Sequence, residues 1–452
     1  MTGLNAVFFS VLILSVLLLA GKLLRVKVKL FQRIFLPASI IGGFLGLIAG
    51  PFGLDLSPEF IMDVWKQIPG ILINIVFATL FLGVSIPGVR KIWSMGGSQL
   101  CFGAVIGTGQ YFVALLTTAL VLTPLFGVSH VFGTILEIGF SGGHGTAAGM
   151  ESVFTSVGFP EGTALAYMSA TVGIIVAVVG GIIFINIAIR KGQCVNFDKN
   201  QGIPEYKKIG LIKDDSDRYS NSMATVASES IEPLAFHFSI VALATLVGWG
   251  LLVLVRKSHP LLEGFPLFPL AMIGGMIVQI ISRPIKIDRY YDKNTFDRIL
   301  GLSLDFLVVA AISSLRLDLF LENIWPFLIL MVVGILWIVF TLVFLAPKMI
   351  PNNWFERGIT EYGMQTGVTA IGLLLLRLVD PHYKTDTAQA FGFKQIIYEP
   401  FLGGGFITAT IPFIVFGKGI WWSIIVAAAL MVFFVVLSAL NGWVNIKRRA
   451  WR

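Results

Sequence analysis

The chain has 452 residues, of which 56% are hydrophobic and 13% charged, and its formal net charge is +8. Soluble domains are about one quarter charged, so this composition excludes a wholly soluble protein. It predicts an all-α polytopic membrane protein, in which basic cytoplasmic loops explain the net charge and no nucleic-acid partner is required.

The first half of the chain contains apolar runs that we interpret as crossings of a bilayer core about 30 Å thick. These predicted crossings are residues 4–24, 37–50, 71–87, 99–126 and 162–189. The first run has no basic region before it and no small-residue cleavage site after it, so we expect a retained span and no signal peptide. Charged residues between the second and third runs, namely Asp55, Glu59, Asp63 and Lys66, predict a loop.

A glycine-rich stretch at residues 139–149 follows the fourth crossing. Each glycine costs about 1 kcal/mol in a helix interior relative to alanine, so we expect the backbone to leave the helix there. In lipid, a broken backbone persists only where protein buries it or where it lines a water-filled cavity. We therefore interpret residues 131–149 as a re-entrant hairpin whose tip binds a small polar solute. The alternative is a glycine-rich helix-packing surface, which the polar residues Ser141, His144 and Thr146 disfavour.

The second half of the chain repeats features of the first half in the same order. A polar segment at residues 193–232 predicts a cytoplasmic linker between the two halves. The motif PxxxxGG at residues 37–43 recurs at residues 269–275, and Asn74 has a counterpart in Asp305. A second interrupted segment at residues 358–371 follows an apolar run at 327–344. This order predicts an internal repeat with inverted topology, which is typical of secondary transporters.

We expect four parts: a first membrane repeat at residues 1–191, the linker at 192–232, an inverted second repeat at 233–418, and an extra transmembrane helix with a basic tail at 419–452. Five crossings and one non-crossing hairpin in each repeat require the second copy to be inverted. Basic clusters at residues 22–33, 283–298 and 447–452 place the amino terminus outside and the carboxy terminus in the cytoplasm. Arg256 and Lys257 fall outside in this scheme, which is a mild exception to the rule.

The two interrupted segments are expected to meet near the midplane and to form the binding site. Helix N-termini offer N–H groups and positive dipole ends to an anion, so a carboxylate substrate fits, whereas carbonyls freed at the breaks suit sodium. The expected substrate-binding residues are Ser141, Gly142, Gly143, His144, Gly145, Thr146, Gln365, Thr366, Gly367 and Thr369. His144 is interpreted as a substrate contact or a structural strut, with a proton carrier as the alternative.

Sodium is the expected coupling ion, and neither a cofactor nor another metal is expected. The candidate sodium ligands are Asn74, Ser141, Thr171, Asp305 and Gly363. Asp305 lies within a span and could coordinate a cation, carry a proton, or pair with Arg377 or another basic group. Arg377 and Asp380 could form a gate or a substrate clamp, because arginine binds carboxylates in bidentate fashion; the alternative is an ion pair at the membrane edge.

The stretch Ser141-Gly-Gly-His-Gly-Thr146 resembles the signature of the bacterial sodium/glutamate symporters, the glutamate:sodium symporter family. The resemblance covers roughly residues 4–418 in the order of their elements. The second interrupted segment matches at Gly363 and at residues 369–371, whereas residues 360–361 and 365–366 replace the family's usual His-Cys and glycine-rich pattern. The span at residues 421–440 has no counterpart in the first repeat, and it looks like an addition to the family's pattern. The resemblance implies sodium coupling, a homodimer and elevator-like movement of the hairpin-bearing domain past a scaffold.

These observations predict a secondary active transporter for sodium-coupled uptake of glutamate or a related small carboxylate. We expect the protein to lie in the cytoplasmic membrane, in contact with lipids. We do not expect it to be an enzyme. Proton coupling, or export of another organic anion, is the alternative within transport. A channel is disfavoured by the broken inverted repeats, and an intramembrane hydrolase using Ser141 and His144 is disfavoured because no third residue is identifiable to orient the base.

Overall fold

The computed structural model describes residues 3–33, 36–51, 53–84, 88–194, 209–212, 215–218, 220–315, 321–380, 384–446 and 448. Over these ranges the chain forms helices and no β-strand, which confirms the predicted all-α class. Eight helices of this described part are long and apolar enough to span a membrane. Shorter apolar helices lie at Ala38–Ala49, His130–Phe140, Phe268–Ser282 and Phe406–Lys418. The chain is therefore a multi-pass membrane protein.

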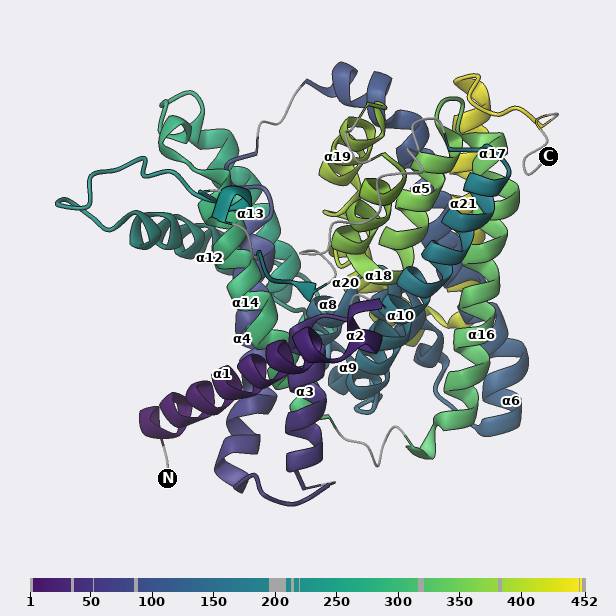
Figure 1. The fold of residues 1–452 in the computed structure, drawn as a ribbon. Helices are drawn as coiled ribbons and strands as arrows, with labels where there is room; N and C mark the ends of the chain where they lie inside the picture. Colours follow the sequence, from purple (N-terminus) through teal and green to yellow (C-terminus); the bar gives the residue numbers. More distant parts are fainter. Residues whose placement is uncertain are drawn as a thin grey trace. The chain divides into compact units, whose positions relative to one another are not determined.

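The chain divides into two compact units, whose helices are labelled in Figure 1. Unit 1 comprises Met1–Ser85, Ala148–Val153 and Glu205–Leu317, and unit 2 comprises Ile86–Ala147, Phe154–Pro204 and Asp318–Arg452. Each unit thus draws on both halves of the chain. The division into repeats, linker and extra helix that we predict from the sequence concerns the order of segments along the chain and not their grouping in space. It stays a prediction. Much of the linker, including residues 195–208, and most of the tail after residue 446 lie outside the described residues.

Among the residues that the structure describes, unit 1 has six principal helices. They are α1 (Leu4–Lys27), α3 (Ala38–Ala49), α4 (Glu59–Thr79), α12 (Pro233–Ser258), α13 (Phe268–Ser282) and α14 (Lys293–Ser313), with the short helices α2 (Lys29–Arg33), η3 (Asp215–Asp217), η4 (Pro260–Leu262) and η5 (Asp288–Tyr290). Helix α3 packs against α1 and α14, and α13 packs against α12 and α4. Helices α3 and α13, which carry the same PxxxxGG motif, therefore correspond in their packing, because each lies against two longer helices of unit 1.

The glycine doublets of α3 and α13 explain this packing. A Cβ atom on Gly42 would lie 2.6 Å from the carbonyl oxygen of Leu17 in α1, and one on Gly274 would lie 2.2 Å from that of Ala244 in α12. The second glycine of each doublet faces α14 in the first copy and α4 in the second. Backbones approach this closely only where side chains are absent. The matched contacts are what an internal repeat predicts; the inverted orientation of its copies stays a prediction.

Helix α4 begins earlier than the hydrophobic run predicted. Glu59, Asp63 and Lys66, which we had expected in a loop, lie in its first turns. Trp65 is buried between them and its indole N–H donates to the carbonyl oxygen of Ser10 at 3.3 Å. The charged residues alternate with buried apolar ones at helical spacing, so a search for continuous apolar runs misses this amphipathic start.

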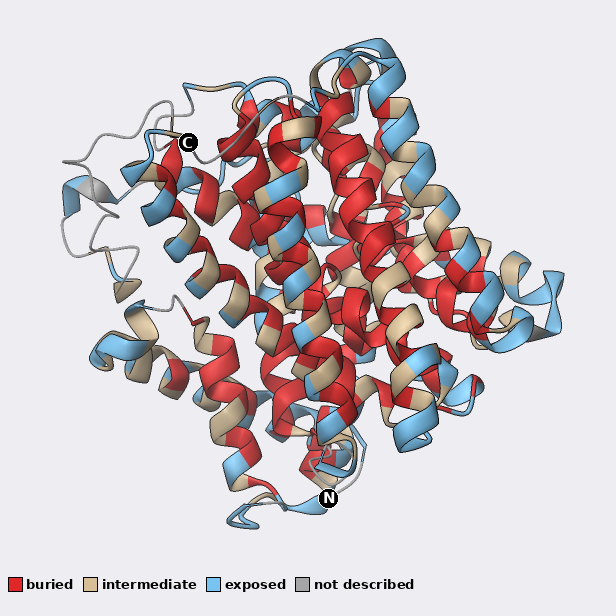
Figure 2. Ribbon diagram, turned by 90° about the vertical axis from the view of Figure 1, so that its right-hand side faces the viewer, coloured by how far each residue is buried: buried red, intermediate tan, exposed pale blue. Residues whose placement is uncertain are grey.

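Unit 2 contains the remaining helices. They are α5 (Val89–Thr117), η1 (Thr118–Leu122), α6 (Thr123–Phe126), η2 (His130–Thr134), α7 (Ile135–Phe140), α8 (Gly143–Gly149), α9 (Glu151–Ser156), α10 (Gly162–Arg190), α16 (Ile324–Phe340), η6 (Thr341–Leu345), α17 (Ala346–Met349), α18 (Trp354–Val379), α19 (Thr387–Tyr398), α20 (Phe406–Lys418) and α21 (Ile420–Leu440), although α8 and α9 contribute residues 148–153 to unit 1. Many helices of the protein bury one side and expose another (Figure 2), whereas residues 96–111 of α5 and 354–367 of α18 are buried on all sides. The additional helix α21 packs along α5.

Two long helices of unit 2 contain a π-helical turn just before a proline. The turn η1 precedes Pro124, and η6 precedes Pro347. Proline has no N–H group and its ring crowds the carbonyl four residues earlier, so a wider turn relieves the helix. This matched pair is what an internal repeat predicts, and the apolar runs of the sequence do not reveal it.

Candidate functional site

The first helix break lies in the glycine-rich stretch. Helix α7 ends at Phe140 and α8 begins at Gly143, whose φ is +71°. Phe132 and Phe159, on either side of the break, place their ring centroids 6.0 Å apart. The chain therefore comes back on itself between these two rings. A re-entrant hairpin at residues 131–149 stays a prediction.

The second break lies within α18, as predicted. Gly367 (φ −141°, ψ 30°) and Val368 (φ 65°, ψ 170°) leave the helical conformation. A Cβ on Gly363 would lie 2.9 Å from the Cα of Gly372. Nine residues of continuous helix would separate those positions by about 13 Å. The two halves of α18 therefore pack side by side, and Gly363 permits their close approach.

A third break follows α19, where Gly403 (φ +67°) and Gly404 (φ +105°) precede α20. A Cβ on Gly403 would lie 3.3 Å from the Oγ atom of Ser141 in the first break. A Cβ on Gly143 would lie 2.3 Å from the Cγ1 atom of Val368 in the second break. All three breaks therefore meet within unit 2. The predicted proximity of the first two is observed, whereas the participation of the third was not predicted.

The polar side chains of the first break have different roles. Ser141 is buried, and within the described structure its hydroxyl has no hydrogen-bond partner, although the Tyr398 hydroxyl lies near it. The His144 Nε2 atom lies 3.0 Å from the Thr171 hydroxyl, which itself donates to the carbonyl oxygen of Tyr167 at 3.0 Å. Because a hydroxyl has one proton to donate, Nε2 is the donor to Thr171. This contact ties His144 to α10 and is compatible with a strut, but the role of His144 stays a prediction.

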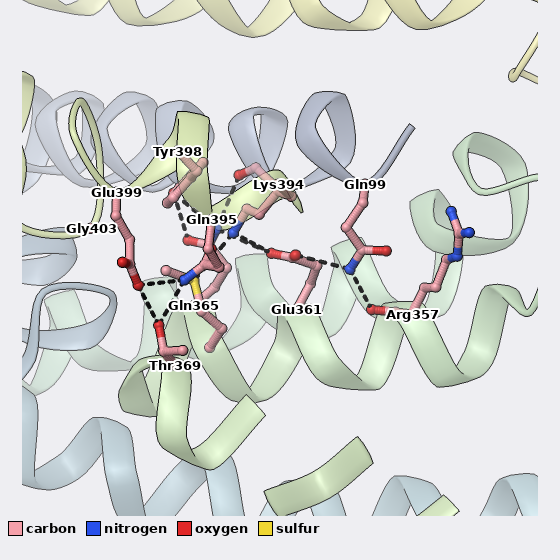
Figure 3. A network of polar contacts seen from close by, with 12 residues as sticks. Gln99, Arg357, Glu361, Gln365, Thr369, Lys394, Gln395, Tyr398, Glu399 and Gly403 are labelled. Atoms are coloured by element: carbon pink, nitrogen blue, oxygen red, sulfur yellow. Dashed lines mark hydrogen bonds and ion pairs between the residues drawn. The ribbon is translucent and has the colours of Figure 1, made fainter. Parts of the chain in front are cut away.

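Most other predicted side-chain contacts are engaged inside unit 2. Thr146 donates to the carbonyl oxygen of Gly142 at 2.9 Å, and Thr366 donates to that of Tyr362. The Gln365 amide donates to Gly103 and Tyr398, and Thr369 donates to the Glu399 carboxylate at 2.8 Å (Figure 3). The hydroxyls of Thr146 and Thr366 thus bond to carbonyls four residues earlier in the chain, and such bonds shape the ends of helices. Among these side chains, the buried Ser141 hydroxyl is the one that has no hydrogen-bond partner in the described structure.

The predicted sodium ligands are distributed over both units. Ser141, Thr171 and Gly363 belong to unit 2, whereas Asn74 and Asp305 belong to unit 1. The Asn74 amide donates to carbonyls of its own helix, at Gly70 and Ile71. The exposed Asp305 side chain interacts with Ser39 and with the charge of Lys22, which is thus a basic group that faces it.

The predicted clamp residues lie at the end of α18. Arg377 is exposed and Asp380 is buried. The Asp380 carboxylate accepts hydrogen bonds from the backbone N–H of Lys384 at 2.8 Å and from the N–H and hydroxyl of Thr385 at 2.8 and 2.6 Å. This carboxylate therefore organises the loop after the helix, which favours a structural role for it.

Glu137 connects the first and third breaks and was not among the residues predicted from the sequence. It is fully buried in α7. Its carboxylate accepts hydrogen bonds from the Tyr111 hydroxyl at 2.5 Å, the Gly403 N–H at 3.0 Å and the Thr408 hydroxyl at 3.2 Å. One carboxylate therefore fixes α7, α5 and the start of α20 against each other.

A second buried network lies behind the break in α18 (Figure 3). The Lys394 ammonium in α19 donates to the Glu361 Oε2 atom at 3.1 Å, and both side chains are fully buried. Gln99 of α5 donates to the other carboxylate oxygen at 2.9 Å. Glu137, Glu361 and Lys394 are charged residues in apolar surroundings, and this property alone would have singled them out as candidates.

Comparison with known proteins identifies one family that the chain matches. A family model described as sodium/glutamate symporter matches residues 3–370 of the chain. The matched range includes the first two breaks and ends before Lys394 and the third break. No match was found among curated proteins.

Proposed function

The chain belongs to the sodium/glutamate symporter family, and we propose that it takes up glutamate or a related small carboxylate together with sodium across the cytoplasmic membrane. Family membership supports sodium-coupled glutamate transport and favours a function other than catalysis. The observation that carries the proposed site is the meeting of three helix breaks around the buried Ser141 hydroxyl.

The substrate carboxylate is proposed to bind where the first and second breaks meet. The half-helix of α18 that starts after Val368 has N–H groups without intrahelical partners and a positive dipole end, both of which attract an anion. Ser141 supplies a hydroxyl that has no partner among the described residues. The glycines at 142, 143, 145 and 367 keep side chains out of the way, and residues 144, 146, 365, 366 and 369 shape this surface.

Sodium is proposed to bind at the opposite kind of helix end. The half-helix of α18 that ends at Thr366 has a negative dipole end and a last turn whose carbonyls lack intrahelical partners, which suits a dehydrated cation, although the Gln365 carbonyl accepts from the Gln110 amide at 2.8 Å. Ser141, Thr171 and the backbone near Gly363 are the proposed ligands from unit 2. Asn74 and Asp305 have local partners in unit 1 and stay a separate prediction.

Alternating access, in which the break-bearing unit moves as an elevator, is part of the proposal, as are a homodimer, an external amino terminus and a cytoplasmic carboxy terminus. The candidate enzyme is disfavoured by a specific contact. His144 Nε2 lies against Thr171, and the Ser141 hydroxyl has no partner within the described chain, so no nucleophile–base pair is formed.

Uptake by the purified protein in proteoliposomes tests the proposal. A panel of labelled small carboxylates is offered with an inward sodium gradient or an inward proton gradient, imposed separately. We expect saturable uptake of glutamate or a close relative that requires the sodium gradient. Uptake driven only by protons would favour the proton-coupled alternative, and uptake without saturation or counterflow would indicate a channel.

A further inference from the structure

Lys394 and Glu361 form a fully buried salt bridge in the interior of unit 2, in which the Nζ atom lies 3.1 Å from the Oε2 atom. Both carboxylate oxygens of Glu361 accept hydrogen bonds, one from Gln99 and one from Lys394. The Lys394 Nζ atom also lies 3.6 Å from the centroid of the Tyr398 ring, which is the geometry of a cation–π contact. Taking two charges out of water is unfavourable, so their presence here requires an explanation other than stability.

Helix α5 provides a slot for this side chain. A Cβ on Gly103 would lie 2.8 Å from the Lys394 Cε atom and 2.9 Å from the Glu361 Oε2 atom. One turn further along, a Cβ on Gly107 would lie 2.4 Å from the Tyr398 hydroxyl. Two glycines on one face of α5 therefore make room for the lysine and for the ring beneath it. The space for the Lys394 side chain is therefore formed by specific residues of α5.

The Lys394 ammonium lies at a position suited to a coupling cation. It approaches the Met364 sulfur at 3.5 Å, in the last turn of the half-helix that ends at Thr366. This end carries a negative dipole charge, and Glu361 adds a full negative charge one turn earlier. Helix ends of this kind, freed by a break, coordinate sodium in secondary transporters.

We propose that Lys394 is a resident cation, which fills a cation site made by Glu361 and the end of the first α18 half-helix and keeps sodium out of it. This inference rests on the proposed sodium coupling. It predicts that the site accepts sodium once the lysine side chain is removed and Glu361 is kept. Each transported substrate would then be accompanied by about one additional sodium ion.

The experiment compares three proteins in proteoliposomes: the wild type, Lys394→Ala, and Lys394→Met/Glu361→Gln. The ratio of labelled sodium to labelled glutamate taken up is measured for each. We expect the ratio to rise by about one ion in Lys394→Ala, with a steeper dependence of uptake on sodium concentration. The double variant fills the space with a neutral side chain and removes the carboxylate, so it keeps the wild-type ratio at whatever rate it retains. Lys66→Ala, at an exposed pair with Asp63, is the matched control.

Thermal unfolding of the same purified variants gives a second measurement that does not depend on transport. We expect sodium or methylammonium to raise the melting temperature of Lys394→Ala, relative to a large organic cation at equal ionic strength, and to leave the double variant unchanged. A Lys394→Ala protein that neither gains a sodium ion in transport nor responds to small cations would overturn the inference. If the wild type takes up no substrate with sodium, the proposed function fails, whereas the unfolding measurement still decides whether Lys394 fills a cation site.

Discussion

The close contact between Gly143 and Val368 offers a test that separates a binding role of the first break from a packing role. Gly143 has a φ of +71°, and an added Cβ would lie 2.3 Å from the Val368 Cγ1 atom. In Gly143→Ala, the left-handed conformation costs about 1–2 kcal/mol. Overpacking against Val368 costs about 1–3 kcal/mol more. The free energy of unfolding should therefore fall by about 2–5 kcal/mol.

The double variant Gly143→Ala/Val368→Ala isolates the two effects, because it removes the clash and keeps the added Cβ. We expect it to recover the part of the stability lost to overpacking, so that about 1–2 kcal/mol of destabilisation remains. We expect uptake to be abolished both in Gly143→Ala and in the double variant, because in both the added Cβ blocks approach of a ligand to the backbone of the break.

Uptake in proteoliposomes and unfolding of the same purified protein are measured together, with Val368→Ala as the control for the truncated valine. Recovery of uptake in parallel with stability in the double variant would refute the reasoning, because the glycine would then serve packing alone.

Three further predictions concern other parts of unit 2. Glu137→Gln places an amide NH2 against buried donors, including the Gly403 N–H, so the free energy of unfolding should fall by about 1–3 kcal/mol. Denaturant unfolding measures this change, and an unchanged midpoint would contradict the prediction. Burial alone would raise the pKa of Asp386, but the hydrogen bond and charge of Arg357 hold it below its usual value. Its stabilising effect is therefore complete above the unfolded pKa of about 3.9 and is lost as pH falls through the lower folded pKa; Asp386→Asn should lack this acid dependence in melting curves. Thr171→Val removes the partner of the buried imidazole and should lower uptake more than the conservative Thr171→Ser does; equal uptake in both would argue against a strut.

The sequence predicted the helical class and the first two breaks because glycine acts locally on the backbone. Gly143 and Gly367 each lie where the chain leaves the helix, and their segments are recognisable without knowledge of the fold. The paired PxxxxGG motifs likewise indicated helices that pack with their backbones close together, since the absence of a Cβ is itself the cause of the approach.

The polar networks could not be assembled from the sequence because their members are far apart along the chain. Glu137 meets Gly403 across 266 positions, and Gln99 meets Glu361 across 262. A buried charge in an apolar segment signals that a partner exists, but its identity depends on how the breaks fold together. The same limit applies to Asp305, for which the sequence suggests pairing with Arg377 or another basic group, and whose side chain interacts with the charge of Lys22.

The central claim is that the three breaks of unit 2 form the site for glutamate and sodium, and binding to paired serine variants tests it most directly. Ser141 and Ser10 are both buried serines whose hydroxyls have no hydrogen-bond partner in the described structure, but Ser10 lies in unit 1. A lost hydrogen bond to a charged ligand is worth about 1.5–3 kcal/mol, so Ser141→Ala should weaken sodium-dependent glutamate binding by about ten-fold or more. Ser10→Ala should bind as the wild type does. Equal binding by Ser141→Ala and the wild type would contradict the account.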